Sequence, residues 1–535
     1  MAADFLRLEK LPRAEDAWYK HVSRNNAPTC LGHTRDELLK SVDEWLSDTS
    51  PSGLRMFWVS GIAGIGKSTI AQTVAVRAGG RGQLGATFFF SRQEKQRRTA
   101  DLVCGTIAYH LSLANRFLKT RIAKALENNP NAGSEVIASQ FEKLISEPLC
   151  DSLNTKFPIL IVIDALDECQ EQGMIELLGL FTSDIYQLPP NVKIFITSRP
   201  EGHIRSTLEP LTDQHKPERP LVLLKALDTT DKTVIRVYLQ EALSLPNIQR
   251  VFPNLVGWEL GGSELDGMVD KTEGLFIVAA TVVKYVMDEE YADPQDRVAI
   301  LLKEDTASRA LTHSAIDYLY LQIITNKISA TASDHVLERF RTVIGTVVLS
   351  FEPLSSKALT ELIGASSLNY VTAALHQLNS VVASPDLDYP LRPQHPSFPD
   401  FITDSSRCEE RFFVDAPKHH SRLAGQCLKT IDTQLSALFS HSIDSNIKTE
   451  ISAAQKYSCC FWDDHLSRSS PDDHPRLLQM LREFLPKRFT CWLGALHRVA
   501  RAADAIPSMI QAQQWLVSLG SIQFQLSYSD RNTLV

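Results

Sequence analysis

The sequence predicts an α/β protein whose first part is a doubly wound parallel sheet and whose remainder is mostly helical. Two observations predict the sheet. Short apolar runs alternate with helical stretches between residues 56 and 225, and several of these runs end in glycine or polar residues. A third observation concerns domain number, because 535 residues exceed what one hydrophobic core normally serves. We therefore expect several domains.

The first predicted strand, Met56–Val59, leads into the sequence GIAGIGKST at 61–69, and a helical pattern follows over Ile70–Ala78. This order of strand, glycine-rich turn and helix is typical of a phosphate-binding P-loop, and it makes the sheet a P-loop NTPase fold. Backbone N–H groups of such a turn attract a polyphosphate at the helix N-terminus. The alternative is a glycine-rich turn that matches by chance, which the flanking elements disfavour.

Each residue type in this turn has an expected role in nucleotide binding. Lys67 is expected to reach the β- and γ-phosphates, and the Ser68 hydroxyl is expected to bind Mg²⁺. The residues expected to contact the nucleotide are Gly61, Ala63, Gly64, Ile65, Gly66, Lys67, Ser68 and Thr69.

A buried parallel strand is predicted at Ile159–Ile163, an unbroken aliphatic run that ends in Asp164. Ligands of open α/β sheets bind at the carboxyl edge of the strands, so Asp164 is expected to hold Mg²⁺ opposite Ser68. Asp167 and Glu168 follow one turn later, where a carboxylate can polarise the attacking water. The alternative for this pair is a helix N-cap followed by a first-turn acid.

A third strand is predicted at Val192–Thr197, and it leads to Arg199. Arg199 is expected to report whether a γ-phosphate is present, and the alternative is a capping or surface arginine. Ala86–Arg92 and Leu221–Leu224 supply two further strands. The helices expected between the strands are Asp101–Leu113, Phe117–Glu127, Ser139–Ser146 and Gly173–Tyr186.

Composition and cysteine usage indicate an ordinary soluble protein. Apolar residues make up 44% of the chain, charged residues make up 22%, and the net charge is -8. This charge disfavours a dedicated nucleic-acid binder, and the basic cluster Arg92–Arg98 is interpreted as a solvated loop. The nine cysteines show no CxxC spacing and are interpreted as reduced, mostly buried thiols. With no signal peptide or membrane span expected, we predict a cytoplasmic protein.

The three motifs together resemble a known family. The sequences GIAGIGKST, LIVIDALDEC and KIFITSRP, with Cys30–Arg35 upstream, resemble the NACHT class of signalling P-loop NTPases, also called STAND NTPases. The resemblance is closest to nephrocystin-type and NLR-like proteins of mushroom-forming fungi, and it runs from about residue 25 to the C-terminal region. It marks Asp167 and Glu168 as the family's characteristic acidic pair and implies that Arg35 contributes to nucleotide binding.

The resemblance also implies a domain order. It predicts an N-terminal linker at 1–24, a nucleotide-binding α/β domain at 25–225, an all-α domain at 226–312, a winged-helix domain at 313–405 and a helical region at 406–535. No helix of the predicted winged-helix domain carries a run of Lys or Arg, so its expected task is that of a lid. In related signalling ATPases a Gly-Leu-Pro turn touches the base, and this chain has Gly274-Leu275-Phe276 instead.

A histidine of the winged-helix domain bonds the β-phosphate of bound diphosphate in NLR-like switches. His395 lies where the resemblance places that residue, although the family's Met-His-Asp is Gln394-His395-Pro396 here. The alternative is a purely structural histidine. Farther along, Trp462 and Trp492 are expected to pack in the core of the C-terminal helical region.

We therefore expect a conformational switch that binds ATP/ADP or GTP/GDP with Mg²⁺ and hydrolyses the triphosphate slowly. The resemblance implies NLR-like recognition or cell-death signalling, with self-oligomerisation and protein partners and no direct nucleic-acid binding. The alternatives are a metabolic kinase or transferase, a ring motor of the AAA+ type, and a non-catalytic scaffold or decoy without effector and sensor modules. The ring motor requires Glu directly after Asp164, where Ala165 stands.

Overall fold

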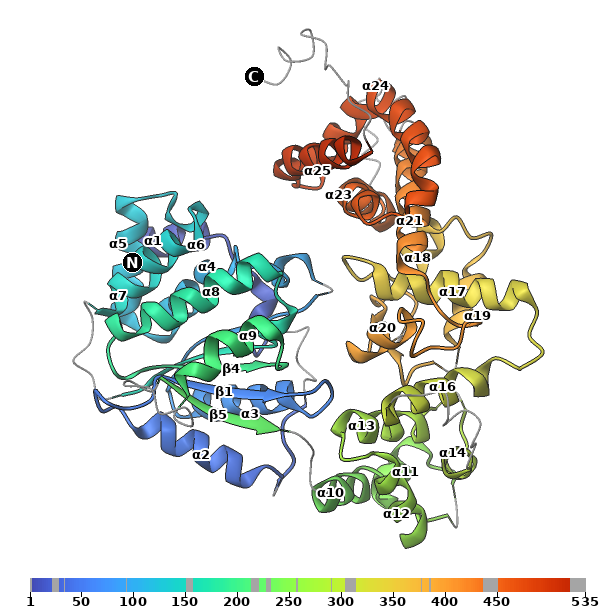
Figure 1. The fold of residues 1–535 in the computed structure, drawn as a ribbon, viewed down its shortest axis with the longest axis horizontal. Helices are drawn as coiled ribbons and strands as arrows, with labels where there is room; N and C mark the ends of the chain where they lie inside the picture. The colour runs from blue at the N-terminus through green and yellow to red at the C-terminus, as the bar shows by residue number, and fades with distance from the viewer. Residues whose placement is uncertain are drawn as a thin grey trace. The chain divides into compact units, whose positions relative to one another are not determined.

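The computed structural model of the chain describes residues 2–21, 28–32, 34–92, 94–150, 157–212, 221–227, 232–255, 258–289, 291–303, 314–376, 378–383, 386–435 and 451–519. The chain forms two compact units, Met1–Val283 and Lys284–Val535. Each unit is described by itself (Figure 1).

The first unit contains the predicted parallel sheet. Its five strands lie in the order β2-β3-β4-β1-β5, and all pairings are parallel. The strands are β1 (Met56–Gly61), β2 (Leu84–Phe89), β3 (Ile159–Asp164), β4 (Val192–Ser198) and β5 (Val222–Leu227). The four strands from β2 to β1 are almost entirely buried, which explains their continuous apolar runs. The expectation of a parallel α/β sheet is confirmed.

Helices cover both faces of this sheet, as a doubly wound fold requires (Figure 1). One core lies between the sheet and the helices α2 (Asp36–Ser47) and α3 (Lys67–Gly80). The other core lies between the opposite face and the helices α4 (Val103–Ala114) and α8 (Glu171–Ser183). Successive residues of β1 enter different cores, since Phe57 belongs to the first and Trp58 to the second.

Further helices complete the first unit. They are α1 (Ala2–Glu9), α5 (Arg116–Asn128), α6 (Ile137–Phe141), α7 (Glu147–Cys150), α9 (Gly202–Leu208), α10 (Lys232–Ala242), α11 (Leu245–Val251), α12 (Gly262–Lys271) and the start of α13 (Phe276–Val286). The helix expected at 139–146 contains a π-helical turn, Glu142–Ser146. Pro148 explains this turn, because it has no N–H for the carbonyl four residues earlier.

The N-terminal segment packs into the core of the first unit. Leu8, Leu11 and Ala14 are buried in its larger core. The backbone N–H of Ala14 donates to Thr106 Oγ1 at 2.9 Å, so the segment is fixed to α4 by hydrogen bonding as well as by burial.

The basic cluster Arg92–Arg98 is only partly the solvated loop that was expected. Arg97 and Arg98 are buried. Arg97 donates to the carbonyl oxygen of Phe89 at 3.1 Å and lies 2.9 Å from Asp16 of the N-terminal segment. A buried guanidinium needs such partners, and Asp16 comes from a segment distant in the sequence.

The second unit is mostly helical, as predicted. Its helices are α14 (Pro294–Leu302), α16 (Ala315–Lys327), α17 (Asp334–Leu349), α18 (Ser356–Leu362), α19 (Leu368–Leu375), α20 (Ser397–Ile402), α21 (Ala416–Thr430), α23 (Ala453–Ser467), α24 (His474–Arg498) and α25 (Ala505–Ser518). Two short strands, β6 (Val382–Ala383) and β7 (Arg392–Pro393), pair in the antiparallel direction. Trp462 and Trp492 are fully buried and lie edge to face, which confirms core packing.

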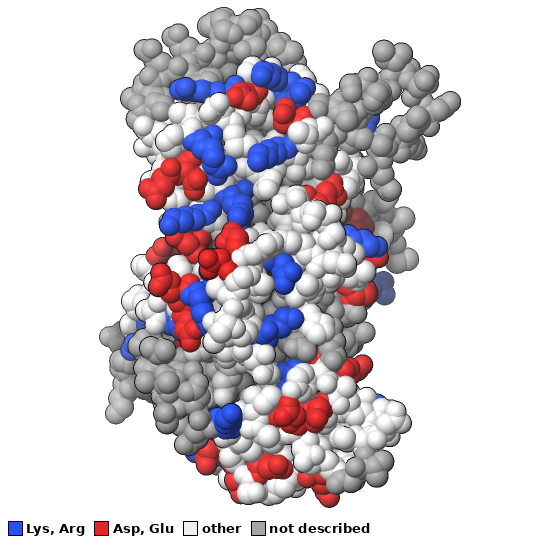
Figure 2. All heavy atoms as spheres, turned by 90° about the vertical axis from the view of Figure 1, so that its right-hand side faces the viewer, with Lys and Arg blue, Asp and Glu red and all other residues white. Residues whose placement is uncertain are grey.

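Charged side chains of both signs and unpaired cysteines are features of the described residues. Figure 2 shows Lys and Arg side chains interspersed with Asp and Glu on the face that it draws. All nine cysteines are free, and six of them are buried. Among the described residues, no helix combines the length and the hydrophobicity needed to cross a bilayer.

Two helical glycines give a stability prediction for the first unit. A Cβ at Gly105 of α4 would lie 2.1 Å from the carbonyl oxygen of Pro12, whereas a Cβ at Gly179 of α8 meets nothing within 4 Å. We expect Gly105→Ala to destabilise the protein by about 1–3 kcal/mol because of this overlap. Gly179→Ala should stabilise it by about 0.5–1 kcal/mol through lower chain entropy.

Urea unfolding monitored by circular dichroism measures both changes in one experiment. Equal effects of the two substitutions would contradict the close packing of the N-terminal segment on α4.

Candidate functional site

The loop between β1 and α3 has a backbone that only glycine adopts easily. Gly64 and Gly66 have φ angles of 79° and 98°, in the left-handed region. At Gly61, a Cβ would lie 2.6 Å from the carbonyl oxygen of Leu227. The glycines of the sequence motif therefore meet two different requirements, a backbone bend and a close approach to β5.

Lys67 lies at the first position of α3 and folds back on the loop. Its Nζ donates to the carbonyl oxygens of Gly61 at 2.7 Å and Ile62 at 2.9 Å. Burial lowers the pKa of Lys67, while the negative charge of Asp167 opposes this shift. The charge of Lys67 is therefore close enough to the acidic residues at the end of β3 to interact with them.

Two more groups bind the loop from outside. Arg35 donates from Nη2 to the carbonyl oxygen of Ile65 at 3.0 Å, and its guanidinium lies over the ring of Phe276. The N–H of Ile277 donates to the carbonyl oxygen of Gly64 at 2.9 Å. These contacts were not anticipated from sequence, although the motif that ends at Arg35 and the turn that ends at Phe276 were both noticed. His33 of that motif lies outside the described residues.

The N-terminus of α3 fits an anionic ligand. Its N-cap residue is Gly66, which provides no side-chain hydrogen bond to the first-turn amides. The Ser68 side chain lies in this first turn and is exposed. Amides at a helix start beside a hydroxyl and a lysine suit a phosphate group with its metal ion.

Asp164 ends β3 and is only 3% exposed. Thr197 of β4 donates to its Oδ1 at 2.6 Å, and the N–H of Ala165 donates to the Thr197 hydroxyl at 2.9 Å. Because β4 separates β1 from β3, the loop and Asp164 start from strands about 10 Å apart. That spacing leaves room for phosphate groups and a hydrated Mg²⁺ ion. The sequence analysis did not predict that Thr197 binds Asp164. A hydroxyl residue near the end of the strand that neighbours a buried acid could have indicated this hydrogen bond.

Asp167 does not cap a helix. It lies in the short 3₁₀ turn Leu166–Glu168, and α8 begins later with Gln170 as its N-cap residue. The Asp167 carboxylate instead binds Arg199. Its Oδ1 accepts from the Arg199 backbone N–H at 3.0 Å, and its Oδ2 lies 3.2 Å from Arg199 Nε. The structure thus brings together two of the residues predicted to be catalytic.

Glu168, the second acid of the pair, is partly buried. Its Oε2 accepts from the backbone N–H of Arg92 at 3.1 Å. Burial, and then the charge of Asp167, raises the pKa of Glu168 to about 7. Arg92 lies three residues after the end of β2 and also donates from Nη2 to the carbonyl oxygen of Asp167 at 3.2 Å. The sequence predicts Arg92 only as the end of a strand and the start of a basic loop, not as a partner of the acidic pair.

His395 belongs to the second unit. Its Nδ1 accepts from the backbone N–H of Ser397 at 3.1 Å and lies 2.8 Å from the Ser397 hydroxyl. An accepting Nδ1 places the proton of a neutral ring on Nε2. The ring is therefore oriented by its own chain, with Nε2 as a hydrogen-bond donor.

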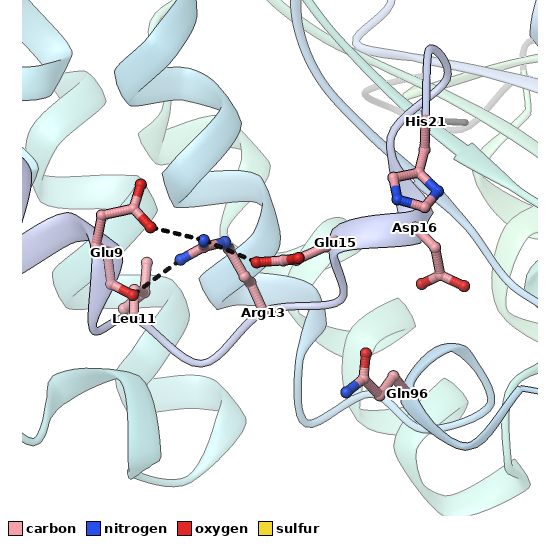
Figure 3. Close-up of a pocket in the computed structure, with 7 residues that line it drawn as sticks. All are labelled: Glu9, Leu11, Arg13, Glu15, Asp16, His21 and Gln96. Carbon is pink, nitrogen blue, oxygen red and sulfur yellow. Dashed lines mark hydrogen bonds and ion pairs between the residues drawn. The ribbon is translucent and has the colours of Figure 1, made fainter. Parts of the chain in front are cut away.

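A separate cavity of about 440 Å³ lies along the N-terminal segment (Figure 3). Arg13 crosses it and binds the carboxylates of Glu9 and Glu15, each at 2.9 Å. Tyr109 also donates to Glu9, at 2.8 Å. These acids already have partners in the chain, so the cavity is explained by the packing of the segment.

Comparison with known proteins bears on the same region. The family model described as Nephrocystin 3, N-terminal, matches residues 33–199. The matched stretch includes the glycine-rich loop, the strand that ends at Asp164, and Arg199. It supports a nephrocystin-like P-loop NTPase domain in this part of the chain. No curated protein matches the sequence.

Several solved structures are similar at a low level. A Walker-type ATPase of Pyrococcus abyssi gives a TM-score of 0.35 at 15% identity, covering 70% of this chain and 97% of that one. A second structure is a signal transduction ATPase with numerous domains (STAND) and a tetratricopeptide repeat sensor, from Pyrococcus horikoshii. Its TM-score is 0.39 at 12% sequence identity, and the alignment covers 96% of this chain and 66% of that one. The ORC1 protein of Aeropyrum pernix, in complex with DNA, has a TM-score of 0.36 at 14% sequence identity. The alignment covers 72% of this chain and 94% of that one. Scores this low do not bear on function.

The raised pKa of Glu168 predicts a pH-dependent stability. The folded state holds this proton more tightly than the unfolded state does, so stability is lost as the pH rises from about 4.3 towards about 7. Glu168→Gln removes this loss. The free energy of unfolding of the variant, relative to that of the wild type, should therefore increase from pH 5 to pH 8. Urea midpoints at both pH values measure the difference.

Glu209→Gln, which removes a carboxylate from the Arg205–Glu209 pair on the surface, is the control. If the Glu168→Gln variant differs from the wild type equally at pH 5 and pH 8, Glu168 has no raised pKa.

Proposed function

We propose that this protein is a nucleotide-dependent conformational switch that binds ATP/ADP or GTP/GDP with Mg²⁺ and hydrolyses the triphosphate slowly. One observation carries the proposal. The glycine-bent loop follows β1, Arg199 follows β4, and Asp164 is the last residue of β3, so all three lie at the carboxyl edge of one parallel sheet. A basic residue, a hydroxyl and carboxylates at this edge are what a magnesium-bound triphosphate requires.

The loop residues divide the binding of the phosphates. In this proposal the amides from Gly61 to Thr69 hold the phosphate oxygens, and Lys67 moves its Nζ from the loop carbonyls to the β- and γ-phosphates. Ser68 and Asp164 hold Mg²⁺, which neutralises phosphate charge when bound. Arg35 supports the loop through the Ile65 carbonyl, next to the nucleotide.

Hydrolysis is assigned to the residues that follow β3 and β4. Glu168 is the candidate general base, because a pKa near neutrality allows it to accept a proton at physiological pH. Asp167 and Arg199 act with it, and Arg199 contacts the γ-phosphate. Slow turnover suits a switch, since fast hydrolysis would end the signal.

The conformational change is assigned to the domains after the sheet. Bound diphosphate holds the winged-helix domain at 313–405 closed through His395, and exchange for triphosphate releases it. The other proposed domains are the nucleotide-binding α/β domain at 25–225, the all-α domain at 226–312 and the helical region at 406–535. Membership of the NACHT class, NLR-like recognition or cell-death signalling, self-oligomerisation and a cytoplasmic location are proposed from the sequence resemblance alone.

A non-catalytic scaffold is the second candidate function. The observation in its favour is that Lys67 and Arg199 already have partners within the chain. Because the positive charges of Lys67 and Arg199 have partners within the chain, the folded protein does not need a nucleotide to neutralise them.

Two substitutions distinguish the switch from the scaffold. Lys67→Ala should weaken triphosphate binding by about 1.5–3 kcal/mol, or roughly 10- to 150-fold, because hydrogen bonds from a charged donor are lost. His395→Ala should leave triphosphate binding intact and remove the protease resistance that diphosphate gives. Isothermal titration calorimetry and limited proteolysis measure these effects, with Lys232→Ala at an exposed ion pair as control.

The switch requires that nucleotide state changes the protease pattern or the oligomeric state. If the protein binds nucleotide and both Lys67→Ala and His395→Ala leave these properties unchanged, the scaffold function stands instead.

A further inference from the structure

The acidic pair is not used symmetrically. Asp167 is 6% exposed, and both of its carboxylate oxygens contact Arg199. Glu168 accepts a hydrogen bond through Oε2 from a backbone N–H, that of Arg92. A carboxylate whose two oxygens hold one arginine is poorly placed to take a proton from water, because protonation would break a charge-assisted contact.

We propose that Asp167 and Glu168 have different tasks: Asp167 is a positioning residue that holds Arg199, and Glu168 is the catalytic base. This inference rests on the proposed function and refines it. In the arrangement described, Arg199 is bound to Asp167, and it must exchange this partner for a γ-phosphate before it can report the triphosphate.

The contacts show which part of Arg199 can move. The backbone N–H of Arg199 is fixed at the end of β4, and its bond to Asp167 Oδ1 does not depend on the side chain. The guanidinium contacts Asp167 through Nε, which lies 3.2 Å from Oδ2, and the Arg199 side chain is 24% exposed compared with 3% for the Asp167 side chain. The guanidinium can therefore rotate away while Asp167 stays in place.

Arg92 is positioned to take over the charge of Asp167. Its Nη2 lies 4.0 Å from Asp167 Oδ2, the same oxygen that contacts Arg199 Nε, and 3.6 Å from Glu201. A buried carboxylate that loses its partner is costly, so a second arginine within this distance lowers the cost of releasing Arg199. Arg92 is accordingly a second positioning residue in the exchange.

This exchange gives a physical basis for distinguishing the two nucleotides. A diphosphate lacks the γ-phosphate charge that competes with Asp167 for Arg199, whereas a triphosphate supplies it. Part of the triphosphate's binding free energy is then used to separate Arg199 from Asp167. Removing the charge of Asp167 should remove that cost and favour triphosphate over diphosphate.

The experiment measures equilibrium affinities for Mg-ATP and Mg-ADP, or for the guanine pair if that is preferred, by titration calorimetry with the full chain. Asp167→Asn keeps the shape of the side chain and removes its charge. We expect the ratio of triphosphate to diphosphate affinity to rise at least about fivefold in this variant. Glu168→Gln should leave the ratio unchanged and abolish single-turnover hydrolysis.

One double variant and two single variants exclude a simple charge effect. In the Arg199→Ala background, Asp167→Asn should no longer change the ratio, because the partner that it releases is absent. Arg92→Ala should lower the ratio, since Asp167 would have no replacement partner. Glu209→Gln, at the C-cap of α9, is the matched control, as it removes a carboxylate from a surface pair with Arg205 and should change nothing.

Each outcome decides the inference. An unchanged ratio in Asp167→Asn, or a rise that persists in the Arg199→Ala background, overturns it while nucleotide binding stands. Complete loss of hydrolysis in Asp167→Asn with retained hydrolysis in Glu168→Gln also overturns it, because the roles would be reversed. Absence of nucleotide binding by the unmodified protein overturns the proposed function itself. Circular dichroism confirms that each variant is folded.

Discussion

The left-handed backbone at Gly64 and Gly66 is the constraint on which the rest of the site depends. It turns the chain from β1 into α3 within a few residues and places the first-turn amides of α3 at the carboxyl edge of the sheet. It also allows the close approach of α13, because a Cβ at Gly64 would lie 1.9 Å from Ile277 Cγ2. A side chain at Gly64 would therefore disturb both the loop and the helix that contacts it.

The polar groups around this loop each have a partner within the chain that a ligand could replace. Lys67 holds loop carbonyls, Arg199 holds Asp167, and Asp164 accepts from Thr197. None of these contacts is covalent, and each involves a group that a phosphate or a metal ion can attract. Partly buried charges need partners at all times, so a ligand replaces contacts rather than creating charges without partners. In the proposed function this replacement is the source of the conformational change.

The sheet and the positions of the main motifs could be predicted from sequence because they depend on local patterns. An aliphatic run such as Ile159–Ile163 identifies its strand directly, and the carboxyl-edge rule then places Asp164. The contacts between motifs could not be predicted. The burial of Arg97, the bond from Thr197 to Asp164 and the packing of Ile277 on Gly64 all join residues from different elements, and no spacing in the sequence encodes them. The distinction between Asp167 and Glu168 belongs to the same class, since adjacent acids differ only in their three-dimensional surroundings.

The central claim is that the loop and the acids at the end of β3 bind a magnesium-bound nucleoside triphosphate. Titration calorimetry of the folded protein with ATP and GTP, with and without Mg²⁺, tests it most directly. We expect saturable binding of one triphosphate per chain, tighter with Mg²⁺ than without it and weakened by Lys67→Ala. The absence of heat and of saturation with both nucleotides, for protein that is folded by circular dichroism, would contradict the claim.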